Sequence, residues 1–508
     1  MDVVVVGAGP VGLWLAAELR AGGSSVLVLE ARDEPDPRSK ALTIHPRTLE
    51  VLASRGVHER FLAEGGRLPG GHFAALDQRL DFSVLDTPFP FTLALPQART
   101  ERLLEEHARG LGVEVRRGHR VVGVERRDDA VVVRAEGPAG ERVFEAAYAV
   151  GCDGTRSTVR EAAGIAFAGT GSRVLGWLGD VVLDEPPAGS ATTRVTADGL
   201  IMVVPLGGGR HRLVGITPGD VRADRPGELS LEELRANTSA ITGTDFGMRD
   251  PSWLSRFGNA SRLADRYRRG RLLLAGDAAH QHFPAGGVGL NVGVQDAANL
   301  GWKLVAVLRG WASQDLLDTY EAERRPVGAE LLAHTKAQTA LMADFTPEGT
   351  ALRDLVGGLV ATHPGVSADL AGRLSGLAVA YPAVEGDHPL TGRRAPDLGG
   401  LFAALRPDRH VLLDLGGDPT ALADVRDAAP GATGPGLTVL RDVSAGDRPD
   451  WAGVRAALVR PDGHVAWAAS PDDDLPDAVR AALSAIGRPS ADTAGRPTAE
   501  RRPRTLGR

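Results

Sequence analysis

The chain has 508 residues, of which 43% are hydrophobic and 24% are charged, and it carries a formal net charge of −7. This length predicts two or three domains instead of one core, and the acidic balance gives no reason to expect a nucleic acid as a partner. No apolar run is long enough to span a bilayer, and no basic region of a signal peptide precedes the apolar run from Val3 to Val6. We therefore expect a cytoplasmic protein that does not enter a membrane.

Residues 2–30 predict a strand, a glycine-rich turn, a helix and a second strand. The turn GAGPVG places Gly7 at the tight bend, Gly9 where a pyrophosphate approaches the backbone, and Gly12 where the helix packs closely on the strand. Glu30 ends the second strand, where its carboxylate can accept hydrogen bonds from both hydroxyls of an adenosine ribose. This combination predicts a dinucleotide site and favours FAD or NAD over a 2′-phosphorylated cofactor.

The segment RSKALTIHPRTLEVLASRG, residues 38–56, predicts an irregular basic loop followed by a helix. Lys40 and Arg47 could neutralise a pyrophosphate or a reduced flavin, although solvated charges before a helix are the more common case. A second amphipathic helix begins at Gln97. Its side chain either caps the chain or faces the ligand, and the sequence leaves both interpretations open.

A further apolar run ends in Cys152-Asp153-Gly154, and Arg156 and Arg160 follow near the start of a helix. This pattern again predicts amides and cations at the mouth of a parallel sheet. Cys152 is the single cysteine, which excludes an internal disulfide and a cysteine-based metal cluster, and we predict no metal site. Because no His or Asn motif accompanies it, we interpret it as a small buried apolar residue.

From residue 165 to about residue 265 the pattern changes to alternating runs such as VLGWLGDVVLD and RHRLVGIT, separated by Gly, Pro and Asp turns. These runs predict an antiparallel or mixed sheet, inserted into the nucleotide-binding fold as a lid or floor for a second ligand. Arg210 and Arg212 lie on one of the strands. They could bind a phenolate or hold a strand edge in solvent, and we favour the second interpretation.

The stretch LLLAGDAAHQHFPAGGVGLN, residues 272–291, combines three features of a ligand site. A buried strand ends in Gly276-Asp277, glycines allow the backbone to lie against a flat ligand, and a helix begins near Leu290. On its own, the pattern fits an ordinary strand–turn–helix connection equally well. Three histidines are candidates for proton transfer, although a structural role is the more common case: His211, His280 and His282.

Residues 386–487 predict a small α/β domain of their own after two long helices. The domain contains no cysteine, which excludes a dithiol redox role. Residues 488–508 are polar, basic and Pro-rich, which predicts a disordered tail.

Three motifs, GAGPVG with Glu30, CDGTRSTVR and LLLAGDAAHQHFPAGGVGLN, together resemble those of the class A flavoprotein monooxygenases, FAD-dependent aromatic hydroxylases with the p-hydroxybenzoate hydroxylase fold. The spacers SKALTIHPRTLEVLASRG and LLDTYEAERRPV resemble the branch of polyketide hydroxylases and rifampicin monooxygenase. The resemblance extends to about residue 485. It implies an α/β fold with a Rossmann-like FAD-binding domain (residues 1–72, 96–164 and 266–385), an inserted mixed β-sheet substrate-binding domain (residues 73–95 and 165–265), and a C-terminal thioredoxin-like domain (residues 386–487) without CxxC.

The resemblance also implies roles for individual residues. Gly7, Gly9, Gly12 and Glu30 would hold the ADP half of FAD, Asp153 would serve both FAD and the reduced nicotinamide, and Asp277 would accept from the ribityl chain. The ring would lie against Gly289, Leu290 and Asn291, with Lys40 and Gln97 as further cofactor contacts, while Pro284, Gly286 and Gly287 would surround the flavin peroxide. No catalytic acid or base is assigned. Val288 replaces the glutamine of the family's GGQG, which removes a polar contact near the flavin.

The activity implied by the resemblance is hydroxylation of an aromatic polyketide or related antibiotic through a flavin C4a-hydroperoxide, by a monomer or homodimer that consumes dioxygen and NADPH or NADH. Two alternatives use the same chemistry: Baeyer–Villiger insertion or epoxidation of a similar polyketide, and inactivation of an antibiotic as in rifampicin monooxygenase. A flavin halogenase is disfavoured because no WxWxIP stretch is present. An alternative of another class is a flavin-containing module that binds a drug without converting it.

Overall fold

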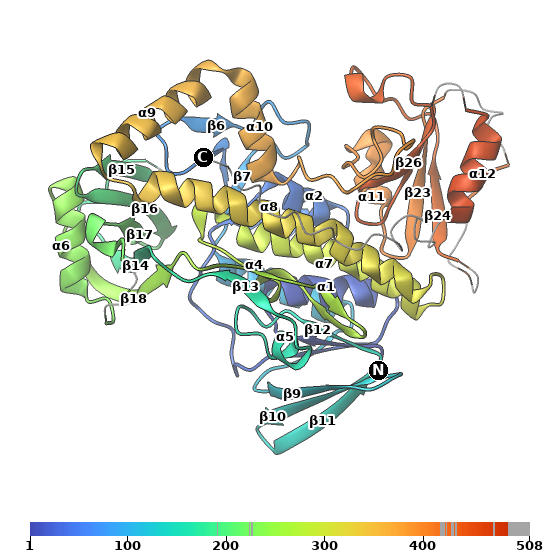
Figure 1. Cartoon of the computed structure of the whole chain (residues 1–508), viewed down its shortest axis with the longest axis horizontal. Coiled ribbons are helices and arrows are strands. Elements are labelled where there is room, and N and C mark those ends of the chain that lie inside the picture. The colour runs from blue at the N-terminus through green and yellow to red at the C-terminus, as the bar shows by residue number, and fades with distance from the viewer. Residues whose placement is uncertain are drawn as a thin grey trace, which may run out of the picture.

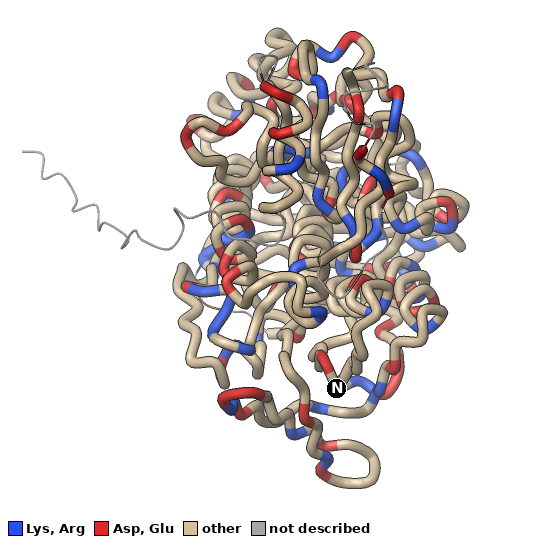
Figure 2. Tube along the Cα trace, turned by 90° about the vertical axis from the view of Figure 1, so that its right-hand side faces the viewer, with Lys and Arg blue, Asp and Glu red and all other residues tan. Residues whose placement is uncertain are grey.

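The computed structural model describes residues 1–485, apart from residues 190, 223, 225–226, 417–421, 423, 428–430, 432–433 and 471–472. The tail predicted at residues 488–508 lies outside the described residues. Within the described part, no helix is both long and apolar enough to cross a bilayer. Acidic and basic residues are interspersed along the trace in Figure 2, as the small net charge leads one to expect.

A six-stranded sheet with the order β20-β21-β12-β1-β2-β8 forms the centre of the N-terminal part. Its five parallel strands are β1 (Val3–Val6), β2 (Val26–Leu29), β8 (Glu114–Arg116), β12 (Tyr148–Gly151) and β21 (Leu272–Leu274), and β20 (Arg268–Arg269) is antiparallel. The apolar runs of β1, β2, β12 and β21 are buried throughout, as expected of parallel strands covered on both faces.

Helices α1 (Pro10–Ala21) and α7 (Gly289–Leu308) pack against each other beside this sheet, and α4 (Gln97–Gly110) packs against α1. A separate three-stranded sheet of β9 (Arg120–Arg126), β10 (Val131–Gly137) and β11 (Gly140–Ala146) lies below the six-stranded sheet in Figure 1. The short helix α5 (Thr158–Ala162) follows β12, where a helix was predicted, and Ser157 is its N-cap.

The segment predicted to contain strands after residue 165 forms a five-stranded sheet with the order β15-β16-β17-β14-β18. Its strands are β14 (Leu175–Val182), β15 (Thr192–Thr196), β16 (Gly199–Gly207), β17 (Arg210–Ile216) and β18 (Arg249–Gly258), and all neighbours pair antiparallel. Helix α6 (Leu231–Thr242) packs on this sheet through an apolar cluster that includes Trp177 and Ile201. The sheet and α6 lie at one end of the molecule (Figure 1).

Three further small sheets are present in the described part: one of β3 (Thr43–Ile44), β7 (Thr92–Ala94) and β4 (Gly66–Leu68); one of β5 (Gly70–His72) and β6 (Arg79–Asp81); and one of β13 (Phe167–Thr170), β19 (Ser261–Ala264) and β22 (His280–Gln281). Helices α2 (Pro46–Ala53) and α3 (His58–Glu64) follow β3. The long helix α8 (Asp318–Ala343) continues through Pro326 and is followed by α9 (Pro347–Thr362) and α10 (Pro364–Ser375).

The C-terminal part contains a four-stranded mixed sheet with the order β24-β23-β25-β26. Its strands are β23 (Arg409–Asp414), β24 (Gly436–Leu440), β25 (Ala456–Val459) and β26 (Val465–Ala468), of which β23 and β24 are parallel. Helices α11 (Leu401–Ala404) and α12 (Leu475–Ala485) accompany it, and the sheet lies at the end of the molecule opposite the five-stranded sheet (Figure 1).

Candidate active site

The three motifs predicted from the sequence lie side by side in space. They follow β1, β12 and β21, which are adjacent parallel strands, so the motifs emerge at the same edge of the sheet. Two backbone hydrogen bonds continue the pairing past the strand ends: Cys152 N donates to the Val6 carbonyl at 2.8 Å, and Ala275 N donates to the Gly151 carbonyl at 3.0 Å. Ligands of open α/β sheets bind at this edge.

The turn after β1 fits a pyrophosphate. A Cβ at Gly12 would overlap the carbonyl oxygen of Gly7, so the helix can lie this close to the strand only with glycine there. A Cβ at Gly9, in contrast, would have no heavy atom within 4 Å, so this glycine borders open space. Free amides at the start of α1 face that space, which suits an anionic group.

Glu30 lies at the end of β2 and is 6% exposed. Its carboxylate accepts hydrogen bonds from the Ala8 amide at 2.8 Å and from the Arg32 amide at 3.0 Å, and it pairs with the Arg32 guanidinium. Burial raises the pKa of Glu30, but the two amides and the guanidinium together lower it below its ordinary value. The carboxylate is therefore held ionised beside the glycine turn, as an acceptor for ribose hydroxyls requires. No sequence motif indicates the contact between Glu30 and Arg32.

Asp153 lies beside the start of α5. One carboxylate oxygen, Oδ2, accepts a hydrogen bond from the Thr158 amide at 2.7 Å, while Oδ1 is buried without a partner among the described residues. Burial raises the pKa of this carboxyl. An unpaired buried acceptor is costly, and a bound cofactor that donates a hydrogen bond would satisfy it.

Asp277 is exposed on the tight turn that follows β21. Asp296 of α7 stabilises this turn, since its Oδ2 accepts hydrogen bonds from the Gly276 amide at 3.1 Å and from His280 Nε2 at 2.8 Å. The Arg324 guanidinium donates to the other oxygen at 2.7 Å. Burial by itself raises the pKa of Asp296, but the effect of Arg324 and His280 is larger in the opposite direction. The pKa therefore lies below its ordinary value, and the carboxylate stays charged.

Asp296 and Arg324 lie on helices with no motif of their own, so no sequence pattern indicates their role. His280 was a candidate for proton transfer, but its Nε2 is hydrogen-bonded to Asp296 and its side chain is fully buried. His282 is likewise occupied, because its Nδ1 donates to the Phe283 carbonyl at 2.7 Å. Both histidines therefore have structural contacts.

The glycine loop before α7 adopts backbone angles that favour glycine. Gly286 has φ 72° and Gly287 has φ 66°, in the left-handed region. The Asn291 side chain closes the loop, since its Nδ2 donates to the Gly287 carbonyl at 2.9 Å and its Oδ1 accepts from the His45 amide at 2.8 Å. The loop is thus fixed without a ligand, with Pro284 before it and the first amides of α7, at Gly289 and Leu290, after it.

His45 supports this loop, and the sequence did not single it out. Its Nε2 donates to the Gly286 carbonyl at 2.9 Å. Burial lowers the pKa of His45 to about 4, so the ring is neutral at physiological pH and, with Nε2 protonated, its Nδ1 is an acceptor. Nδ1 is buried without a partner among the described residues. Only proximity to the basic loop could have drawn attention to this residue.

The basic loop and the start of α4 are joined by Gln97. Its Oε1 accepts from the Ala41 amide at 2.9 Å and its Nε2 donates to Glu101 at 2.8 Å. The structure therefore ties this side chain to the loop beside Lys40, whose own side chain is exposed. The other cation predicted near the cofactor, Arg47, is buried and points away to the C-terminal domain.

The favoured interpretation of Arg212 was wrong. This residue is 1% exposed, and its guanidinium forms two 2.7 Å hydrogen bonds with Asp180 and donates to the Ser39 carbonyl of the basic loop. It lies over the Trp253 ring. Arg212 therefore neither holds an edge in solvent nor has a free guanidinium for a phenolate. Arg210, two residues earlier on the same central strand, donates to the exposed Asp250 carbonyl of the edge strand β18.

Apolar side chains join the glycine loop to the inserted sheet. Phe283, Ala285 and Val288 belong to one buried cluster with Leu200 of β16 and Ile216 of β17. The Phe257 ring of β18 lies 5.3 Å from the Phe283 ring. Val288, at the position of the family's glutamine, is thus part of an apolar surface.

Open space at Gly9, the unpaired acceptor of Asp153 and the preformed glycine loop fit the phosphate, ribityl and ring parts of a flavin dinucleotide. Fold and site together define a FAD-dependent monooxygenase. The family models agree: residues 1–335 match the FAD binding domain, and residues 388–489 match the aromatic-ring hydroxylase C-terminal domain. The chain belongs to the family of FAD-dependent aromatic-ring hydroxylases.

Three similar proteins illustrate the relationship. An uncharacterized aromatic compound monooxygenase (YhjG) of Bacillus subtilis strain 168 is 46% identical, with 96% of this chain and 97% of the relative covered. A rifampicin monooxygenase of Streptomyces venezuelae is 44% identical, with 93% and 97% covered. The solved structure of the OxyS anhydrotetracycline hydroxylase from Streptomyces rimosus matches with a TM-score of 0.84 at 43% identity, covering 96% of this chain and 99% of that one.

Proposed function

We propose that this monooxygenase transfers one oxygen atom of dioxygen to an aromatic polyketide or a related antibiotic, with NADPH as the electron donor. The observation that carries the proposal is the apolar cluster between the glycine loop and the inserted sheet, in which the partly buried Phe257 packs against the buried Phe283. Such an apolar environment suits a large, flat, electron-rich ring system. Two relatives are named rifampicin monooxygenase and anhydrotetracycline hydroxylase, and these names support the same substrate class.

The assignment of domains is part of this proposal. Residues 1–72, 96–164 and 266–385 would bind FAD, and residues 73–95 and 165–265 would bind the substrate. Residues 386–487 would form the C-terminal thioredoxin-like domain. Phe73 and Leu80 share an apolar cluster with Leu200 and Ile216 of the five-stranded sheet, and the cluster extends to Leu341 and Leu374, so it packs the proposed substrate unit against the proposed FAD unit.

We assign the ADP half of FAD to Gly7, Gly9, Gly12 and Glu30, the ribityl chain to Asp277, and the ring to the loop from Pro284 to Asn291, while Asp153 would serve both FAD and the reduced nicotinamide. When bound, FAD supplies the redox chemistry and the activation of dioxygen. The protein's contribution is binding, orientation and exclusion of water. The amides at Gly289 and Leu290 begin a 20-residue helix, whose positive end favours negative charge on the ring by about 1 kcal/mol.

Lys40 and Gln97 are further cofactor contacts in this proposal. Lys40 is an exposed cation beside the cofactor edge, and Gln97 holds the loop that carries it. No group among the described side chains is assigned as acid or base, since His280 and His282 are engaged in structural hydrogen bonds.

The test is aerobic NADPH oxidation by the purified FAD-loaded enzyme with anhydrotetracycline and rifampicin as probes. Faster oxidation and a product heavier by one oxygen atom would support the proposal. NMR of the product would separate hydroxylation from Baeyer–Villiger insertion and from epoxidation, which add the same mass. If either compound binds without accelerating NADPH oxidation or gaining oxygen, a binding module that sequesters the drug explains the protein better.

A further inference from the structure

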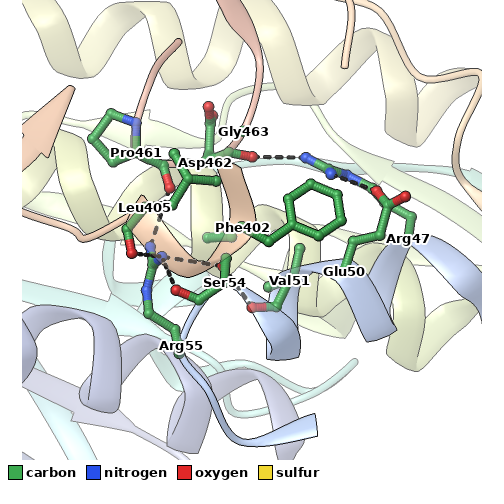
Figure 3. Close-up of a pocket in the computed structure, with 11 residues that line it drawn as sticks. Arg47, Glu50, Val51, Ser54, Arg55, Phe402, Leu405, Pro461, Asp462 and Gly463 are labelled. Atoms are coloured by element: carbon green, nitrogen blue, oxygen red, sulfur yellow. Dashed lines mark hydrogen bonds and ion pairs between the residues drawn. The ribbon is translucent and has the colours of Figure 1, made fainter. Parts of the chain in front are cut away.

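The turn between β25 and β26, residues Pro461 to Gly463, inserts between helices of the cofactor-binding part (Figure 3). Arg47 Nη2 of α2 donates to the Asp462 carbonyl at 2.7 Å, and Arg55 Nη2 donates to the Pro461 carbonyl at 3.2 Å. The remaining cavity at this contact has a volume of only about 10 Å³, space for about one water molecule. The contact is therefore close-packed.

Charged side chains with little exposure link the same turn to α7 and α8 by ion pairs and hydrogen bonds. Arg460 pairs with both oxygens of Glu323 on α8 at 2.8 Å and with Asp462 at 2.5 Å. Asn299 of α7 donates to both carboxylates, and Lys303, which is fully buried, donates to Glu323 at 2.7 Å. Because Glu323 and Asp462 share hydrogen bonds with both Arg460 and Asn299, the turn has a defined orientation relative to the helices.

Two of these helices begin at the glycine loop of the active site. His45, which donates to the Gly286 carbonyl, immediately precedes α2, and Arg47 is two residues further along. Asn291, which closes the loop, lies in the first turn of α7, two helical turns before Asn299. The C-terminal turn thus contacts α2 close to the end that carries a loop contact, and it contacts α7 near the middle of the helix, two turns after Asn291.

We propose that the C-terminal domain positions the glycine loop, with Arg47 as the residue that transmits the contact from the Asp462 carbonyl to His45. The functional consequence for the flavin ring rests on the proposed function of this loop. The domain, which lacks cysteine, then has a role in the cofactor site without chemistry of its own.

Arg55 provides a matched control. Like Arg47, it has a buried guanidinium, pairs with a carboxylate at 2.8 Å and donates to a carbonyl of the same turn. It differs in place, since it follows the C-terminal end of α2 and is ten residues from His45. If the domain only adds stability, the two arginines should be equivalent. If it positions the loop, they should differ.

The experiment compares Arg47→Met and Arg55→Met by hydrogen exchange at residues 284–291 of the protein freed of FAD. Arg47→Met is expected to accelerate exchange there roughly tenfold, and Arg55→Met less than about twofold. With FAD restored, the visible circular dichroism of the flavin is expected to change only in Arg47→Met. Unchanged exchange in Arg47→Met, or equal acceleration in both variants, would overturn the proposal.

Failure of the proposed function is separable from failure of this inference. If the wild-type protein does not bind FAD, the function is wrong, while the exchange data on the apo protein still decide whether Arg47 orders the loop. Should Arg47→Met not fold, Arg47→Lys keeps the buried charge but cannot span both Glu50 and the turn, so the same acceleration is expected in smaller degree.

Discussion

Asp277 lies on an exposed turn, so its side chain can be removed without opening a cavity in the core. We expect Asp277→Ala to leave the free energy of unfolding of the apo protein within about 0.5 kcal/mol of wild type. The loss of an acceptor for the ribityl chain should weaken FAD binding roughly tenfold, about 1.4 kcal/mol. Fluorescence titration of the apo protein with FAD measures this affinity. Wild-type affinity together with full NADPH consumption would remove Asp277 from the site.

Arg212 is expected to contribute to stability, because its side chain is buried with Asp180 as its partner. Arg212→Met leaves that carboxylate without its countercharge, which costs about 3–5 kcal/mol in buried pairs. Urea unfolding of the apo protein measures the loss. Arg210→Met on the same strand is the control and should cost less than about 1 kcal/mol, since Arg210 contacts only an exposed carbonyl. Equal losses would contradict the distinction.

The environments of such side chains could not be predicted from the sequence. Arg212 and Arg210 differ in neither charge nor strand, and what separates them is contact with Asp180 and Ser39, far away in the chain. His45 likewise acquires its role from Gly286, 241 positions later. Glycines and carboxylates at strand ends were predictable because their requirement is local: a turn geometry and the edge of a sheet.

At the scale of elements, the glycine turn between β1 and α1 contains one glycine that is expected to affect FAD affinity alone, Gly9, and one that is expected to affect stability, Gly12. Gly9 has φ −76°, which any residue adopts, and open space at its Cβ position, so Gly9→Ala should leave the apo protein as stable as wild type within about 0.5 kcal/mol. Its methyl group should nevertheless obstruct the pyrophosphate and weaken FAD binding roughly tenfold or more.

Gly12→Ala is the converse case, because its Cβ would overlap the Gly7 carbonyl. We expect a loss of at least about 2 kcal/mol in the free energy of unfolding, since α1 must move away from the strand. Thermal unfolding of the two apo variants, followed by FAD titration of whichever folds, measures both effects. A destabilised Gly9→Ala, or a fully stable Gly12→Ala, would contradict this account of the turn.

The elements themselves were largely predictable, because their signals are periodic or terminal. Helix α4 begins at Gln97 and α5 follows the CDG motif, as the sequence predicts. The order of strands in the sheets depends on contacts between distant segments, and the five-stranded sheet, predicted as antiparallel or mixed, is antiparallel throughout.

For the whole molecule, buried histidines predict how stability depends on pH. Burial lowers the pKa of His45, His410 and His464 to about 4. The unfolded chain takes up these protons near pH 6.5 and the folded chain only near pH 4, so stability is lost as the pH falls through this window. Each histidine contributes a slope of about 1.4 kcal/mol per pH unit.

His410→Phe tests this slope away from the cofactor site, where the ring packs against Trp302. The difference in the free energy of unfolding between variant and wild type should change by about 1.4 kcal/mol per pH unit between pH 6 and pH 5, in favour of the variant at lower pH. Urea unfolding at several pH values measures it, and carboxyl groups cancel because both proteins contain them. A constant difference across this range would contradict the prediction.

The hydrogen bond from Arg47 to the Asp462 carbonyl joins residues 415 positions apart. During synthesis, α2 leaves the ribosome long before residues 461–463, which Arg47 contacts, have been made. Arg47 therefore lacks this hydrogen bond in the incomplete chain, because a contact between such distant residues forms late in folding. If this contact orders the glycine loop as proposed, the loop becomes fully ordered only when almost the entire chain has been made, and a chain truncated before residue 460 should be degraded by cellular quality control even though it contains every proposed flavin contact.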